Sequence, residues 1–375
     1  MNILILRPDN IGDVVLFSGA LQHIRSRYSE AHITLAVQAH IINLVELCPY
    51  IDAIVPVEPL TWWGRVGRTY FPLKHRFKMA IHHLNRVWNT IRKPYDCVIY
   101  PLKSPSVSHL EILSDLQPKQ TFGIIGCDLC APKTGFPPEL HPVKLFTHYY
   151  DVSKINQWQH ESLITLGFLR FLGCCVTTFD EVKPQFWLSD SEQNHLDTVK
   201  KNGRKIIGIF PGASYKGKQW EADNYEELSR LLEIPLTYVI FGGSADKDLT
   251  AQVAYLIKKG SGGAEVINFA GVTSLRELVV SISSCDLFIG MDTSGLHIAI
   301  ATNVPTIGIV GGGHFGRFVP WGDPETNIFL TYKMECFNCN WICVTNMECV
   351  RNVSPHDVAD ATKKLLIMDL SKRSA

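Results

Sequence analysis

The sequence predicts an α/β protein with two doubly wound domains that face each other across a central cleft. Three observations support this fold class. A chain of 375 residues is too long for one ordinary core and suits two domains. Short β-branched runs alternate with amphipathic segments, as in parallel sheets that are covered on both faces. The alternation occurs in two series, which the polar stretch 180–203 separates.

The expected strands are short apolar runs bounded by turn residues. In the first series they are residues 2–6, 32–37, 53–57 and 97–100. In the second series they are residues 205–210, 236–241, 265–269, 286–289 and 306–310. The second series is the more regular, and its spacing of about 30 residues is typical of βαβ units.

Capping pairs indicate where helices begin between these strands. Asn224 followed by Glu227, and Ser274 followed by Glu277, have the spacing of a capping box. The expected organisation is an N-terminal Rossmann-like domain (1–180), a linker (181–203), a C-terminal Rossmann-like domain (204–350) and a C-terminal helix (351–375). The C-terminal domain includes a cysteine-rich segment at 336–349.

The composition argues against several classes of protein. With 36 basic and 36 acidic side chains the formal charge is zero, so nucleic acid is not the expected partner. The apolar run at 3–6 ends at Arg7, which is too short for a signal peptide, and no stretch approaches the roughly 20 apolar residues of a membrane span. Eleven scattered cysteines are unlike a secreted disulfide scaffold, so we expect a cytoplasmic protein.

The first candidate site follows the first expected strand, at residues 7–13. Gly12 permits a tight turn, and a helix expected to start near Val14 leaves Asp13 at a helix N-terminus. An ionised carboxylate there can accept a proton from a hydroxyl group. The alternative is that Asp13 only caps the helix, as most aspartates in this position do. The loop lacks the G-x-G-x-x-G pattern, which argues against a dinucleotide site.

The second candidate site follows the expected strand at 286–289. Small residues at this strand-to-helix turn expose backbone N–H groups at the positive end of a helix, which suits phosphate oxygens. A histidine in the first turn adds a further donor. The alternative is an ordinary βα loop with a structural histidine. The candidate binding residues are Asp292, Thr293, Ser294, Gly295 and His297.

The third candidate site is the loop after the expected strand at 205–210. Lys216 and Lys218, with the Ser214 hydroxyl between glycines, suit a diphosphate as charged and hydrogen-bonding partners. The alternative is a solvated surface loop, in which such lysines are common.

These three loops together resemble those of one family. The ADP-heptose:lipopolysaccharide heptosyltransferases of glycosyltransferase family 9 have similar motifs in the same order and with the same spacing. In this chain the motifs are Ile11-Gly12-Asp13, then Pro211-Gly212-Ala213 with Lys218-Gln219-Trp220, then the run from Met291 to His297. The resemblance covers most of the chain, up to about Pro320.

The resemblance implies a GT-B fold in which the N-terminal domain binds the acceptor and the C-terminal domain binds a nucleotide-sugar donor. It implies that Asp13 is the catalytic base and that Lys218 neutralises the leaving diphosphate. Ser214 and the residues from Asp292 to His297 would bind the donor. Asp246, in the loop after the expected strand 236–241, would contact the ribose, although the family often has Glu there.

The implied reaction is inverting transfer of a heptose, or a related sugar, from an ADP-sugar to a hydroxyl of a lipopolysaccharide-core, glycan or protein acceptor. No catalytic cofactor is implied, because Lys218 and a helix N-terminus supply the positive charge. One alternative is a sugar-nucleotide epimerase or hydrolase of the same fold, which needs no acceptor. Another is a metal-binding assembly protein with a relict transferase fold, against which the presence of Asp13 and Lys218 argues.

A basic aromatic segment at 59–94 contains no acidic residue. Its Arg65 and Arg68 are the candidate acceptor-binding residues, because positive charge interleaved with aromatic rings suits an anionic glycan or lipid-linked acceptor. The same charge suits peripheral contact with the anionic surface of the inner membrane. The alternatives are a solvated basic helix face over part of the segment and, more weakly, nucleic acid.

Four cysteines lie within fourteen residues near the C-terminus. They could form disulfides, stay as thiols or bind a metal ion, and a reducing cytoplasm disfavours the disulfides. Four thiolates satisfy the ligand count of a structural zinc or iron site. Some heptosyltransferase-like enzymes that modify autotransporters carry a comparable cluster that holds iron. We expect such a metal to brace a loop or an oligomer contact. The residues are Cys336, Cys339, Cys343 and Cys349.

A glycine-rich run departs from the family pattern. Gly311, Gly312 and Gly313 follow the last expected strand, where the family usually has a less glycine-rich loop. The run is either a second loop that approaches phosphate or a flexible lid.

Overall fold

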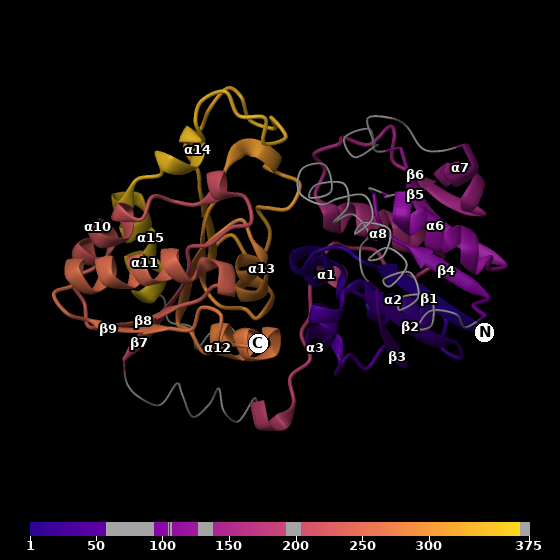
Figure 1. Cartoon of the computed structure of the whole chain (residues 1–375), viewed down its shortest axis with the longest axis horizontal. Coiled ribbons are helices and arrows are strands. Elements are labelled where there is room, and N and C mark those ends of the chain that lie inside the picture. Colours follow the sequence, from indigo (N-terminus) through magenta and orange to yellow (C-terminus); the bar gives the residue numbers. More distant parts are fainter. Residues whose placement is uncertain (58–93, 104, 106, 127–137, 193–203, 368–375) are drawn as a thin grey trace, which may run out of the picture. The chain divides into compact units, whose positions relative to one another are not determined.

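The chain folds as two compact units. The computed structural model describes residues 1–57, 94–103, 105, 107–126, 138–192 and 204–367. The units are Met1–Pro184 and Gln185–Ala375. Each contains a parallel β-sheet with helices packed on it, which confirms the α/β prediction (Figure 1).

The sheet of the first unit has six described strands in the order β3-β2-β1-β4-β5-β6, all parallel. The strands are β1 (Asn2–Arg7), β2 (His32–Val37), β3 (Ala53–Pro56), β4 (Cys97–Tyr100), β5 (Gln120–Ile125) and β6 (His148–Asp151). The described α-helices are α1 (Ile11–Phe17), α2 (Ala20–Arg27), α3 (Ile42–Val45), α6 (Val107–Leu116), α7 (Pro142–Leu145) and α8 (Glu161–Phe171).

The central strands of this sheet are buried on both faces. Alternate residues of a strand point to opposite faces, so Leu4 and Leu6 of β1 share one cluster with Tyr100 of β4 and with Leu110 and Leu113 of α6. Helices α1 and α2 pack against α8. The four strands expected from the sequence are present, whereas β5 and β6 were not predicted. Strand β6 is the polar sequence His-Tyr-Tyr-Asp at a sheet edge, which carries no apolar pattern.

The sheet of the second unit also has six described strands, in the order β12-β11-β10-β7-β8-β9, all parallel. The strands are β7 (Lys205–Phe210), β8 (Leu236–Ile240), β9 (Glu265–Asn268), β10 (Leu287–Met291), β11 (Thr306–Ile309) and β12 (Asn327–Leu330). The described α-helices are α10 (Asp223–Leu231), α11 (Lys247–Gly260), α12 (Leu275–Ser283), α13 (Ser294–Ala301), α14 (Glu348–Arg351) and α15 (Pro355–Ile367).

Helices cover this second sheet on both faces. Ile207 and Ile209 of β7 belong to a core with Tyr225 of α10, Val253 of α11 and Val358 of α15. Helices α12 and α13 pack together, and Figure 1 shows them on the opposite side of the strands from α10, α11 and α15. The five strands expected from the sequence are present within one or two residues. Strand β12 was not predicted.

One of the two predicted capping boxes is correct. The Ser274 side chain accepts a hydrogen bond from the backbone N–H of Glu277, and the Glu277 side chain accepts one from the N–H of Ser274. The prediction at Asn224 is wrong, because α10 begins at Asp223 after Ala222, which makes no side-chain cap. Helix α1 begins at Ile11, three residues before the expected start. Asp13 therefore lies inside the first helical turn.

Both sheets have the same connectivity around their first strand. In the first unit β1 lies between β2 and β4, and in the second unit β7 lies between β8 and β10. The loops that leave β1 and β4, or β7 and β10, diverge to opposite faces of the sheet. Ligands of doubly wound sheets bind at this switch point, beyond the carboxyl ends of the strands. The fold thus indicates one candidate site in each unit.

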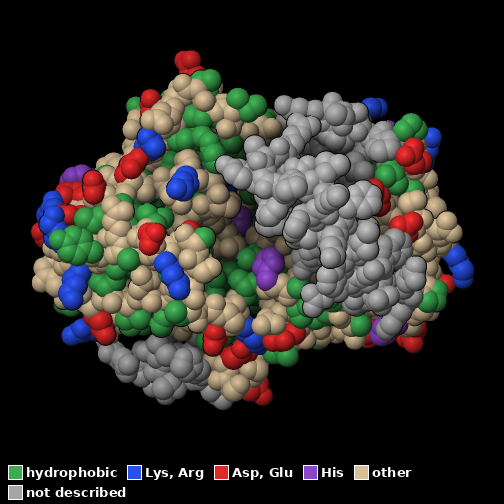
Figure 2. Space-filling view, viewed as in Figure 1, with side chains coloured by type: hydrophobic (Ala, Val, Ile, Leu, Met, Phe, Trp, Pro, Cys, Tyr) green, Lys and Arg blue, Asp and Glu red, His purple; other side chains and the backbone are tan. Residues whose placement is uncertain are grey.

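The surface of the second unit shows no concentration of one sign of charge on the face in Figure 2, as far as the described residues go. Basic and acidic side chains alternate there, in agreement with the formal net charge of zero. None of the helices in the described ranges is long and apolar enough to cross a lipid bilayer.

Candidate functional site

The switch point of the second unit holds a partly buried ion pair. Lys218, in the loop after β7, donates from Nζ to Oδ2 of Asp292, which follows β10, over 2.7 Å. The Lys218 side chain is 19% exposed and the Asp292 side chain is 8% exposed. Two candidate residues that lie 74 positions apart in sequence are therefore in direct contact. A cation held in this way has its position set before a ligand arrives, because Asp292 limits its freedom.

Helix α13 begins beside this ion pair. Its N-cap Thr293 has an extended backbone and makes no side-chain cap, so the first backbone N–H groups of α13 have no side-chain acceptor from the N-cap. Gly295, in the first turn, packs on Phe210, and a Cβ there would lie 2.6 Å from the Phe210 ring. The uncapped N–H groups and the positive end of the helix dipole suit an anion.

His297 lies one turn into α13 and is buried. The indole Nε1–H of Trp321 donates to Nδ1 of His297 over 2.9 Å, and the two rings stack. Because indole nitrogen can only donate, Nδ1 of His297 must accept, and the neutral imidazole carries its proton on Nε2. Nε2 lies 4.0 Å from Oδ1 of Asp292. The structure thus places His297 next to Asp292 in the wall of the site, and a direct contact with a ligand stays a prediction.

Asp246 lies against the loop that carries Lys218. Its Oδ2 accepts from the backbone N–H of Gly243 over 2.8 Å. A Cβ on Gly212 would lie 2.6 Å from Oδ1 of Asp246, so a larger residue there would displace this carboxylate. The loops after β7 and β8 are therefore in contact, with the half-buried Asp246 carboxylate between them. Ser214 is exposed on the same β7 loop.

The switch point of the first unit is organised by Arg7, which the sequence analysis did not select. Arg7 ends β1 and is buried. Its Nη1 donates to the carbonyl oxygen of Pro101, just after β4, and its Nη2 donates to the carbonyl oxygen of Asp13, each over 2.9 Å. The guanidinium also forms an ion pair with Asp9 over 2.5 Å. Arg7 thus joins the two strands of the switch point and fixes the first turn of α1.

Two carboxyl groups share this position. Burial raises the pKa of Asp9 to about 7; the Arg7 charge opposes the rise, and the nearby Asp13 and Glu161 carboxylates add to it. Asp13 is partly exposed, and its Oδ2 accepts a hydrogen bond from the Asn10 amide over 3.4 Å. Paired acids with different surroundings allow one to hold a proton while the other is ionised. The sequence signal for Asp9 was an acidic residue two positions after a buried strand.

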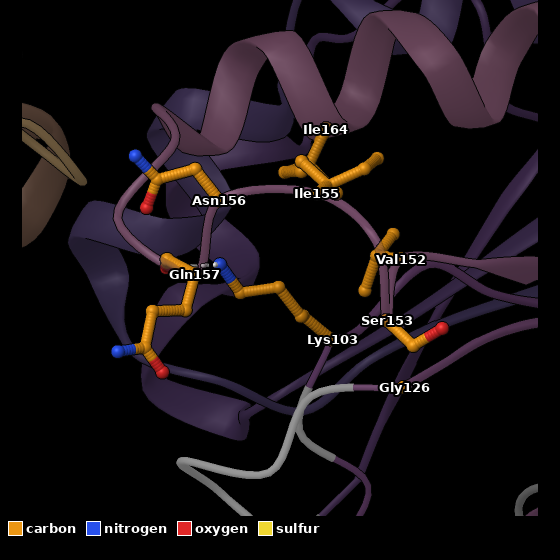
Figure 3. A pocket seen from close by; sticks show the side chains of 8 residues that line it. All are labelled: Lys103, Gly126, Val152, Ser153, Ile155, Asn156, Gln157 and Ile164. Carbon is orange, nitrogen blue, oxygen red and sulfur yellow. Dashed lines mark hydrogen bonds between the residues drawn. The ribbon is translucent and has the colours of Figure 1, made fainter.

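A cavity of about 250 Å³ lies near this switch point in the first unit (Figure 3). Lys103, three residues after β4, has a side chain that is 3% exposed and forms an ion pair with Glu161 over 3.0 Å. Its Nζ also donates to the carbonyl oxygen of Gln157. Sequence analysis missed Lys103, because an isolated lysine after a strand carries no motif. The cavity is lined by Lys103, Gly126, Val152, Ser153, Ile155, Asn156, Gln157 and Ile164.

The glycine-rich run after β11 is packed against the cysteine-rich segment. A Cβ on Gly312 would collide with the ring of Phe337, and a Cβ on Gly313 would collide with that of Trp341. These glycines therefore admit two aromatic side chains at close range. The structure gives Gly312 and Gly313 a packing role, and the two hypotheses from the sequence, a phosphate-approach loop and a flexible lid, both stay predictions.

The four cysteines of the predicted metal site lie in one segment but do not form a ready-made site. Cys349 is buried, and Cys336, Cys339 and Cys343 are partly exposed. Burial disfavours the Cys343 thiolate, but hydrogen bonds from the backbone near Met347 and from Thr345 lower the pKa of Cys343 overall. Over the described ranges, no three His, Cys, Asp or Glu side chains are arranged to hold a metal ion. Arg65 and Arg68 lie outside the described residues.

Comparison with known proteins shows the family to which part of this chain is similar. Residues 172–342 match the family described as glycosyltransferase family 9 (heptosyltransferase). The chain is 27% identical to lipooligosaccharide heptosyltransferase 2 of Campylobacter jejuni over 230 residues, which are 60% of this chain and 71% of that protein.

Two solved structures show the similarity of fold. A family 9 glycosyl transferase from Veillonella parvula is 19% identical with a TM-score of 0.73, over 98% of this chain and 97% of that one. TibC of enterotoxigenic Escherichia coli, an iron-containing dodecameric heptosyltransferase solved with ADP-D-β-D-heptose, is 14% identical with a TM-score of 0.53. That match covers 97% of this chain and 75% of TibC.

Proposed function

We propose that this chain, as a family 9-like glycosyltransferase with the GT-B fold, transfers a heptose from an ADP-sugar. The proposed acceptor is a hydroxyl group of a lipopolysaccharide core. The observation that carries the proposal is the Lys218–Asp292 ion pair beside the uncapped N-terminus of α13. A preset cation and backbone N–H groups that the N-cap side chain leaves uncapped, at one switch point, suit a diphosphate leaving group. The names of the similar proteins support heptose as the sugar.

The donor is bound by the second unit. Lys218 donates to Oδ2 of Asp292 and, over 3.5 Å, to its carbonyl oxygen, and the remaining N–H can bind an oxygen of the diphosphate. The N–H groups at the start of α13, with Thr293, Ser294 and Gly295, bind the remaining phosphate oxygens. Asp246 accepts a hydrogen bond from the ribose, and Ser214 adds a hydroxyl at the edge of the site. Positive groups that are already in place stabilise the leaving charge without reorganisation.

Asp13 of the first unit acts as the base. Its carboxylate takes the proton of the acceptor hydroxyl, whose oxygen attacks the anomeric carbon on the face opposite the diphosphate. The bond from that carbon to the diphosphate oxygen breaks, so the configuration inverts, as in inverting glycoside chemistry. Arg7 holds the carbonyl of Asp13 in place and also pairs with Asp9, whose pKa burial raises to about 7. Asp13 is partly exposed, so its carboxylate is available to the acceptor hydroxyl.

The acceptor is bound by the first unit, with one of its sugar residues in the Lys103 cavity. A volume of about 250 Å³ lies just below the roughly 300–1,000 Å³ of cavities for drug-sized ligands, which suits a monosaccharide. The Lys103–Glu161 pair and the amides of Asn156 and Gln157 offer both donors and acceptors, as vicinal hydroxyls require. Arg65 and Arg68 are the proposed partners of anionic groups elsewhere on the acceptor.

Three further assignments belong to this proposal. Cys336, Cys339, Cys343 and Cys349 bind a structural zinc or iron ion, which would require their side chains to converge on it. Backbone N–H donation to Cys343, seen at 3.0 Å from Met347, is typical of sulfurs that act as thiolate ligands. The protein works in the cytoplasm, at the surface of the inner membrane, and forms oligomers.

The experiment that tests the proposed function is release of ADP from ADP-heptose, measured with and without a deacylated lipopolysaccharide-core acceptor. We expect release that depends on the acceptor and a product that gains one heptose by mass. Equal release without acceptor would instead identify a hydrolase. Interconversion of the donor without release would identify an epimerase.

A further inference from the structure

The cysteine-rich segment reaches the donor site of the second unit. Its backbone is hydrogen-bonded to the glycine run, from the N–H of Asn338 to Gly312 over 2.7 Å and from the N–H of Asn340 to Gly313 over 3.1 Å. Gly313 accepts the ring of Trp341 at a distance that no other residue type would allow. The segment is therefore docked along the loop after β11, which is the neighbour of β10.

Trp341 contacts the proposed donor-binding lysine. Nζ of Lys218 lies 4.5 Å from the centroid of the Trp341 ring, within the range of a cation–π interaction. The rings of Tyr215 and His314 meet the indole edge-on, at 6.0 Å and 5.9 Å between centroids. An ammonium has three N–H groups. Asp292 accepts from it through Oδ2 at 2.7 Å and through its carbonyl oxygen at 3.5 Å, and the Trp341 ring lies against it, so an anion can approach only from the remaining side.

The conformation of Trp341 is unusual for a bulky residue. Its φ is +60°, in the left-handed region that favours glycine, and φ of Asn340 is +51°. The Nε1–H of Trp341 is buried and finds no hydrogen-bond partner in the described residues. Both features cost free energy, so the contacts of the indole with Lys218 and Gly313 must hold it there. Such unfavourable features occur preferentially at functional sites.

We propose that Trp341 is a positioning residue for Lys218, through which the cysteine-rich segment 336–349 controls the affinity of the site for a diphosphate. The inference rests on the proposed function, in which Lys218 binds the diphosphate of the donor. Cys339 and Cys343 lie two residues before and two residues after Trp341, so the conformation of the cysteine segment sets the position of the indole. The indole in turn limits the Lys218 ammonium to the side of Asp292.

The test is a double-mutant cycle on full-length protein, with the binding of ADP and of adenosine measured by calorimetry. Trp341→Ala should weaken ADP about tenfold, as loss of a partly desolvated cation–π contact predicts, and adenosine less than twofold. Trp341→Phe retains an aromatic face and should recover most of the ADP affinity. In a Lys218→Met background, Trp341→Ala should have no further effect on ADP, because it acts through the missing ammonium.

Matched controls come from the same segment. Ile342 and Val344 are 75% and 81% exposed, so Ile342→Ala and Val344→Ala should leave both affinities unchanged. An unchanged ADP affinity in Trp341→Ala, an equal loss for ADP and adenosine, or an effect that persists without Lys218 would each overturn the inference. If Lys218→Met itself fails to weaken ADP more than adenosine, the proposed donor site fails as well. The two failures are therefore distinguishable.

Discussion

Replacing Lys218 by Met separates the role of this residue in stability from its role in binding. Methionine keeps the length and apolar stem of the side chain but leaves the Asp292 carboxylate, 8% exposed, without its cation. Removing one member of a buried ion pair costs about 3–5 kcal/mol, and we take about 3 kcal/mol because the Lys218 side chain is 19% exposed. For a unit of this size each kcal/mol shifts Tm by roughly 2–4 °C. The expected fall in Tm is therefore roughly 6–12 °C.

The measurements are thermal unfolding and calorimetric binding of ADP and adenosine. The double variant Lys218→Met with Asp292→Asn also removes the unpaired negative charge of Asp292. It should regain more than half of the lost Tm, without regaining ADP affinity. That affinity should fall roughly 10–100-fold in both variants, since a charge-assisted hydrogen bond to phosphate is lost, while adenosine binds as before. Lys258→Met, at an exposed position of α11 in the same unit, is the control and should change neither quantity by much. If the single variant unfolds at the wild-type temperature, or the double variant is no more stable than the single one, the ion pair does not have the role assigned to it.

Three further predictions concern the other candidate groups. Asp13→Asn should lower the rate of transfer by about 10²–10⁴ at unchanged ADP affinity, because shape is kept and basicity is lost; near-normal turnover would remove Asp13 from the mechanism. Because the folded-state pKa of Asp9 is raised to about 7, its protonated form stabilises the fold at low pH, and this contribution is lost as the pH rises toward 7 and beyond. In Asp9→Asn, denaturant unfolding between pH 4 and pH 8 should lose that part of its pH dependence, and an identical profile would contradict the raised pKa. Elemental analysis of protein purified without chelator should find about one zinc or iron per chain, and Cys336→Ser with Cys339→Ser should lose it and lower Tm; metal-free protein with titratable thiols and unchanged melting would end the metal assignment.

Several of these side chains could be selected from the sequence because they directly follow residues with a recognisable strand pattern. The strand at Lys205–Phe210 is a continuous apolar run, as a strand buried on both faces must be, and the loop after it follows directly. Lys218 and Asp292 lie in such loops, and Asp13 lies in the first turn of the helix that follows β1. In contrast, β6 has no apolar pattern, and its pairing with β5 is a property of the folded sheet.

The sequence by itself determined the fold class, most of the strands and the loops that hold the candidate groups, because hydrophobic periodicity and turn chemistry are local. The tertiary structure alone decided which loops meet. Lys218 contacts Asp292 only because β7 and β10 are neighbours at the switch point, although β8 and β9 separate them in the chain. Likewise, the glycine at 313 is explained by the ring of Trp341, which local sequence does not place there. Strand order and side-chain packing depend on the burial of the whole sheet, so contacts between distant loops follow from the assembled core and not from any one segment.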